Sequence, residues 1–118
     1  MKNVPISLIL GMILLAIPTS LSSQNINLIS YNIRYDNKGD SINNWNDRKE
    51  TMAALIQHYD ADIVGTQEAL HHQVTYLDSA LPGFSYLGVG RDDGKEKGEY
   101  TAIFYNTDKF KVLKTNTF

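Results

Sequence analysis

The stretch Asp62-Ile-Val-Gly-Thr-Gln-Glu68 predicts a buried β-strand over 62–67 that ends in polar side chains. It is rich in β-branched residues on both of its faces, which favours a strand that is covered on both sides. Gln67 and Glu68 are the last two residues of this stretch, so a carboxylate lies at the carboxyl end of the strand. In open α/β sheets that end is the usual place for a ligand crevice.

Regular elements are predicted on both sides of this strand. Two successive strand–helix–strand steps, followed by strands that short loops connect, predict a mixed sheet of the α/β or α+β class. The predicted order is a strand over 27–33, a helix over 47–59, the second strand over 62–67, a helix over 70–81, strands over 84–89 and 100–106, and the start of a fifth strand over 109–113.

The first predicted helix has a clear apolar periodicity. Asp47 is expected to cap it, with Glu50 three residues later completing a capping box. The spacing of its apolar residues predicts one buried face, made of Met52, Leu55, Ile56 and Tyr59.

Composition narrows the class of protein. The 118 residues allow one domain, and the net charge of -2 gives no broad basic surface for nucleic acid. The absence of cysteine excludes disulfides, thiolate metal sites and cysteine nucleophiles. No sequence feature indicates a stable protein partner.

The first 23 residues are expected to be a signal peptide, which leaves 24–118 as a partial catalytic domain. Lys2 precedes an apolar run over 6–17, and small polar residues follow it. The mature chain would begin near Gln24, and the protein would be secreted or periplasmic. The alternative is an uncleaved membrane anchor, but the run is shorter than the roughly 20 residues that span a bilayer.

Polar residues also end the first predicted strand. Asn32 lies at its carboxyl end, and parallel neighbouring strands would bring Asn32 close to Gln67 and Glu68. An amide oxygen and a carboxylate form a hard-oxygen site that suits Mg²⁺ or Mn²⁺. The alternative is a glutamate that faces solvent or begins a helix.

Three sequence blocks resemble one enzyme family: YNIR at 31–34, DIVGTQE at 62–68 and GRDDGKEKGEYTAIFY at 90–105. They are similar, in order and spacing, to the opening of the endonuclease/exonuclease/phosphatase family. The resemblance implies the N-terminal half of a four-layer α/β/β/α sandwich with a mixed sheet, truncated in this chain. It also implies divalent-metal-dependent hydrolysis of phosphodiester or phosphomonoester bonds.

The resemblance implies roles for four residues. Glu68 matches the principal metal-binding carboxylate, and Asn32 matches an asparagine that helps form the metal and phosphate site. Glu99 resembles an acidic residue that orients a catalytic histidine. Arg91 would contact a substrate phosphate, or it is a solvated loop cation. His71 and His72 are expected to have no metal-binding role, because adjacent helix positions point apart.

Other residues of the family's site have no match in this chain. The resemblance implies a histidine, an Asp-x-Asn pair and a late aspartate–histidine pair on later strands. Neither pair occurs in the sequence, and none of the three histidines, His58, His71 and His72, occupies a matching place. We therefore expect a full-length phosphoesterase, acting on nucleic acid, phospholipid or a sugar or inositol phosphate, of which this chain alone is inactive. The alternatives are a catalytically dead exported binding module and a non-functional gene fragment of the same fold.

Overall fold

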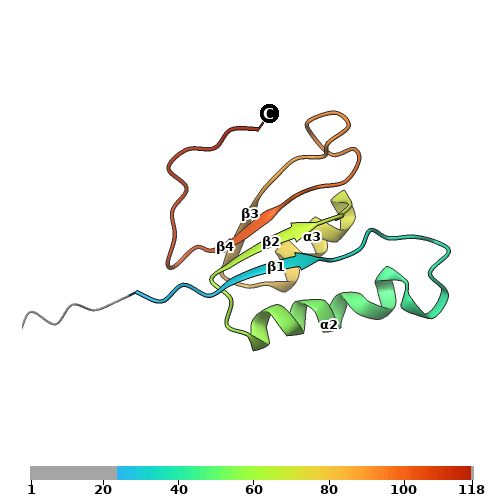
Figure 1. The fold of residues 1–118 in the computed structure, drawn as a ribbon, viewed down its shortest axis with the longest axis horizontal. Coiled ribbons are helices and arrows are strands. Elements are labelled where there is room, and N and C mark those ends of the chain that lie inside the picture. Colours follow the sequence, from blue (N-terminus) through green and yellow to red (C-terminus); the bar gives the residue numbers. More distant parts are fainter. Residues whose placement is uncertain (1–23, 118) are drawn as a thin grey trace, which may run out of the picture.

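A four-stranded sheet with two helices forms the protein in the computed structural model, which describes residues 24–117 (Figure 1). The predicted signal peptide lies outside the described residues. The strand order is β1-β2-β4-β3, with β1 and β2 parallel and the other neighbours antiparallel. The mixed α+β class is as predicted. The elements are β1 (Leu28–Asn32), η1 (Ser41–Asn43), α2 (Trp45–His58), β2 (Ile63–Gln67), α3 (His71–Ala80), β3 (Phe84–Leu87) and β4 (Ile103–Asn106).

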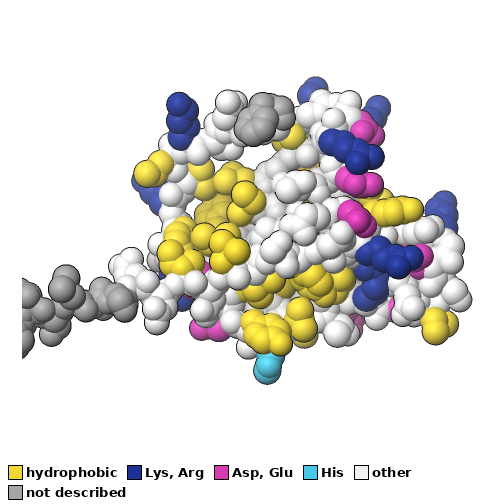
Figure 2. Space-filling view, viewed as in Figure 1, with side chains coloured by type: hydrophobic (Ala, Val, Ile, Leu, Met, Phe, Trp, Pro, Cys, Tyr) yellow, Lys and Arg dark blue, Asp and Glu magenta, His cyan; other side chains and the backbone are white. Residues whose placement is uncertain are grey.

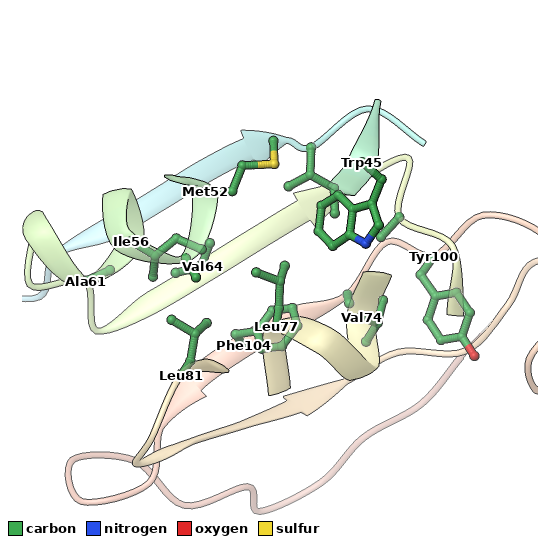
Figure 3. Packing of buried hydrophobic residues seen from close by; sticks show 14 residues of the cluster. Trp45, Met52, Ile56, Ala61, Val64, Val74, Leu77, Leu81, Tyr100 and Phe104 are labelled. Carbon is green, nitrogen blue, oxygen red and sulfur yellow. The ribbon is translucent and has the colours of Figure 1, made fainter. Parts of the chain in front are cut away.

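The core lies between one face of the sheet and the helices. Val64 of β2 and Phe104 of β4 are paired in register, so both side chains point to this face, and both are fully buried. Figure 3 shows them among the apolar side chains of α2 and α3. The helix residues of this cluster are Trp45, Met52, Ala53, Ile56, Val74 and Leu77.

The opposite face of the sheet is open. Alternate residues of a strand point to opposite faces, so Leu28 and Asn32 of β1 point away from the helices. Leu28 is 68% exposed and Ile103 of β4 is 45% exposed. Figure 2 shows hydrophobic side chains gathered on the molecular surface in this view. An open, partly apolar sheet face is what the N-terminal half of a two-sheet sandwich presents.

Helix α2 differs from its prediction at the start and along its buried face. It begins at Trp45 and is capped by Asn44, whose Oδ1 accepts a hydrogen bond from Asn46 N at 2.9 Å. The prediction of Asp47 as the cap was therefore wrong. Leu55 and Tyr59 were predicted to be buried, but they are 37% and 60% exposed.

The last predicted strand is absent from the described residues, because 109–113 forms no regular structure. Residues 100–102 also lie outside β4, although Tyr100 makes isolated bridges to Ala69 and Gly90. No described helix is long and apolar enough to cross a membrane.

Candidate functional site

The carboxyl ends of β1 and β2 meet at one edge of the sheet. Asn32 stands opposite Gln67 in the parallel register, and Ile33 N donates to Gln67 O at 3.1 Å. This pairing places Asn32 beside Glu68, and Asn32 Nδ2 donates to Glu68 Oε1 at 2.7 Å. The structure thus brings together the two residues that the sequence predicts as metal ligands.

Both strands end in left-handed backbone turns. Glu68 has a φ of 61° and Arg34 a φ of 57°, in a region that non-glycine residues rarely occupy. Asn32 Oδ1 accepts a hydrogen bond from Arg34 N at 2.9 Å, which stabilises the turn after β1. The Asn32 amide is therefore held at its oxygen by Arg34 and directed through its nitrogen to Glu68.

A cleft of about 880 Å³ opens beside this pair, within the usual size range of ligand pockets. Asn32 and Glu68 form one wall of the cleft. Its other described wall comes mainly from the segments 87–91 and 99–103. The charged residues that line it are Glu68, Arg91 and Glu99.

Arg91 and Glu99 form an ion pair inside this cleft. Arg91 Nη1 lies 3.0 Å from Glu99 Oε2, and Arg91 N donates to Glu99 O at 3.1 Å. The Arg91 side chain is 65% exposed, so it stays accessible from solvent. The described residues that line the cleft include no histidine that Glu99 could orient.

The loop that carries Arg91 is tightly folded. A Cβ atom on Gly90 would lie 2.2 Å from Lys97 O, so glycine is required there. Asp93 Oδ1 accepts from Lys97 N and Lys95 N, at 3.0 and 2.8 Å. These backbone hydrogen bonds lower the pKa of Asp93. The carboxylate therefore closes the loop, as a turn residue does.

The two adjacent histidines have protein partners. The Tyr100 hydroxyl donates to Lys95 O at 2.7 Å, so it accepts from His71 Nδ1, which lies 2.9 Å away. His72 Nε2 lies 3.0 Å from Asp36 Oδ2. Both rings connect loops to the start of α3.

A sequence profile described as the endonuclease/exonuclease/phosphatase family matches residues 29–117. The chain belongs to this family. The match covers β1, β2 and the loop with Arg91, and so contains all three sequence blocks on which the resemblance rests. No match was found among curated proteins.

Solved structures of family proteins show the same fold. A family protein from Bacteroides vulgatus is 47% identical over 80% of this chain, with a TM-score of 0.78. A mannosyl-6-phosphatase from Bacteroides thetaiotaomicron is 48% identical over 76% of this chain, with a TM-score of 0.73. The chain spans 36% and 34% of the lengths of these two proteins.

The donors at the sheet edge are a carboxylate and an amide oxygen, which are ligand types that suit a Mg²⁺-type ion. Among the described residues, no three His, Cys, Asp or Glu side chains group in a way that could hold a metal ion. Mg²⁺ needs only one or two protein carboxylates, because water and substrate phosphate complete its shell. Glu68 supplies one carboxylate, and Asn32 holds it while keeping a second lone pair on its own Oδ1.

Two polar side chains near the site, the half-buried Arg48 and the fully buried Gln73, bond to the backbone of the loop after β1. Arg48 donates to the carbonyl oxygens of Ile33 and Arg34 at 2.5 and 3.0 Å. Gln73 was not singled out, although it is fully buried and bonds to Arg34 O. The sequence feature that could have indicated this role is a polar amide, Gln73, next to Val74 on the apolar face of the helix.

Proposed function

We propose that the full-length protein is an exported phosphoesterase that uses Mg²⁺ or Mn²⁺ and acts on a sugar phosphate. The observation that carries this proposal is the hydrogen-bonded pair Asn32–Glu68 at the edge of the sheet, open to a cleft of ligand size. Family membership supports the hydrolysis of phosphate esters. Export rests on the charged, apolar and small-polar order of residues 1–23.

The chain's own residues would divide the work at this site. Glu68 would hold the cation, and Asn32 would fix the orientation of that carboxylate through its amide nitrogen. Arg91 would bind a phosphate oxygen, which requires its guanidinium to share or leave Glu99. When bound, the cation would neutralise charge on the phosphate oxygens and the leaving group.

Charge in the cleft supports a small substrate over a nucleic acid. Among the described residues, one cation and two carboxylates line it, whereas nucleic-acid backbones are held by several lysine or arginine side chains. The 48% identical neighbour is described as a mannosyl-6-phosphatase. A single phosphate on a neutral sugar needs only one arginine and one metal ion, which this cleft can offer.

The test measures phosphate release by the full-length protein with Mg²⁺, with Mn²⁺ and with EDTA. The substrates are mannose 6-phosphate, an inositol phosphate, bis-p-nitrophenyl phosphate and plasmid DNA. We expect metal-dependent release that is fastest from the sugar phosphate. No metal-dependent hydrolysis of any ester would contradict the enzyme proposal and favour a binding module. Cleavage of DNA alone would contradict the substrate class.

A further inference from the structure

Gln73 is a buried polar residue on the apolar side of α3. Its exposed fraction is 0%, as are those of Val74 and Leu77, its neighbours in the core. Burying an amide is unfavourable unless its polar atoms are hydrogen-bonded. The Gln73 side chain makes three hydrogen bonds, all to backbone atoms of loops that end at the candidate site.

The three bonds connect the loop after β1 to the loop after β2. Gln73 Oε1 accepts from Asp36 N and from Leu70 N, each at 3.0 Å, and Nε2 donates to Arg34 O at 3.1 Å. Arg34 follows Asn32 by two residues, and Leu70 follows Glu68 by two residues. One side chain therefore joins the segments that carry both halves of the pair.

This link lies where the strand pairing stops. The ladder between β1 and β2 ends at Asn32 and Gln67, so Glu68 lies beyond its last pair. Each loop has a left-handed residue within two positions of the end of its strand, Arg34 after β1 and Glu68 after β2, and surrounding contacts must maintain this conformation. Gln73 satisfies backbone groups on both sides that no strand partner reaches.

We propose that Gln73 is a positioning residue that sets the placement of Glu68 relative to Asn32, and thereby the geometry of metal and phosphate binding. The inference rests on the proposed function of that pair. Gln73 does not touch the cleft, so it acts through the two loops. Displacements of about 1 Å in a site can lower rates on the order of 100-fold, so loosening both loops is expected to be visible in catalysis.

The main variant is Gln73→Met in the full-length protein, which keeps the length of the side chain and removes all three hydrogen bonds. Gln73→Glu is the second variant, because it keeps the size and both acceptor contacts and loses the donor to Arg34. Leu77→Ala is the matched control. Leu77 lies one turn further along the same helix and is equally buried, and its side chain has no polar atom that could form a hydrogen bond to either loop.

Two measurements are made at a temperature at which all variants are folded by circular dichroism. The first is the Mg²⁺ titration of activity, with kcat and KM determined separately. The second is the side-chain amide resonance of Asn32 in a ¹⁵N spectrum, assigned by its loss in Asn32→Ala. This resonance reports the hydrogen bond to Glu68 and does not require activity.

We expect Gln73→Met to lower kcat by about 10- to 100-fold, to raise the Mg²⁺ concentration for half-activation and to shift the Asn32 resonance. Leu77→Ala should leave kcat, the Mg²⁺ concentration for half-activation and the Asn32 resonance near their wild-type values. The values for Gln73→Glu should lie between those of Gln73→Met and Leu77→Ala, and Gln73→Glu is the test variant if Gln73→Met does not fold. If wild type is inactive, the proposed function fails, and the resonance alone decides the positioning role. A Gln73 variant that matches Leu77→Ala in every readout would overturn the inference.

Discussion

Replacing Glu68 with Gln tests the metal role of the site with little change in shape. Glutamine has the same length as glutamate, and its side-chain oxygen can still accept the hydrogen bond from Asn32 Nδ2. The backbone at this position has a φ of 61°, and glutamine tolerates that value no worse than glutamate does. The fold should therefore survive, and the charge is the main property lost.

The structure indicates how large the effect should be. Glu68 is the one carboxylate in contact with Asn32, and the other carboxylate of the cleft, Glu99, is paired with Arg91. Charge stabilisation by a metal is worth several kcal/mol, and each 1.36 kcal/mol changes a rate tenfold. A loss of about 3 to 4 kcal/mol corresponds to a decrease in kcat/KM on the order of 100- to 1000-fold.

The assay is hydrolysis of the sugar phosphate by the full-length protein over a Mg²⁺ titration, with circular dichroism to check folding. Glu96→Gln is the matched control, since it removes the same charge from a side chain that is 73% exposed on the Arg91 loop. We expect the control to retain near-normal activity. Near-normal activity of Glu68→Gln at ordinary Mg²⁺ would refute the metal role and most of the proposed function.

Four further predictions follow from the sequence and the structure. The described chain by itself should show little or no hydrolysis of bis-p-nitrophenyl phosphate with Mg²⁺ or Mn²⁺. Catalytic residues that act together lose most of the rate when some of them are missing. Robust turnover would contradict this prediction. The hydrogen bond from Lys109 Nζ lowers the pKa of Asp62 in the folded protein. The ionised Asp62 therefore stabilises the fold above the ordinary pKa of 3.8, and this stabilisation is lost as the pH falls through the lowered pKa. Urea unfolding of Asp62→Asn should therefore depend less on pH in that acidic range, and an unchanged dependence would count against the ion pair. Phe104→Ala should reduce the free energy of unfolding by about 3 to 5 kcal/mol, measured in urea, because Phe104 is fully buried; a loss below 1 kcal/mol would contradict the packing. Amino-terminal sequencing of the exported protein should begin near Gln24, and an intact first methionine on a membrane-extracted protein would be the opposite result.

The convergence of Asn32 and Glu68 was accessible from sequence because it depends on strand geometry. Alternating and β-branched residues indicate each strand, and parallel strands carry their carboxyl ends to one edge. The polar residues that end the two strands then fall side by side without any knowledge of the loops. The structure adds the register, with Asn32 opposite Gln67, and the direction of the hydrogen bond.

The first residue of α2 and the face that it buries could not be predicted from the sequence in this way. Asn44 and Asp47 are both good capping residues, so local preference does not choose between them. The choice follows from packing, because Trp45 is buried and meets Tyr76 of α3 edge to face at 5.6 Å. Burying Trp45 fixes the face of the helix that meets the core and leaves Tyr59 exposed.

The role of Gln73 could not be predicted from the sequence, for a different reason. A periodic apolar pattern identifies which face of α3 is buried, but it treats a polar residue on that face as an interruption. Two of the three partners of Gln73 are backbone atoms 37 and 39 residues away, at Asp36 and Arg34, and no sequence pattern shows that these backbone groups need a partner. Only the folded loops show that this amide is the residue that satisfies them.

The two pairs of polar residues in the cleft differ in how firmly they are held. Asn32 is bonded at both ends of its amide, and the loops around Glu68 are tied by the buried Gln73. Arg91 and Glu99 are held by a glycine-bounded loop and by each other, with the guanidinium largely in solvent. Under the proposed function, Asn32 and Glu68 would be in place before a metal ion arrives, and the exposed ion pair would open to release Arg91 to an incoming phosphate.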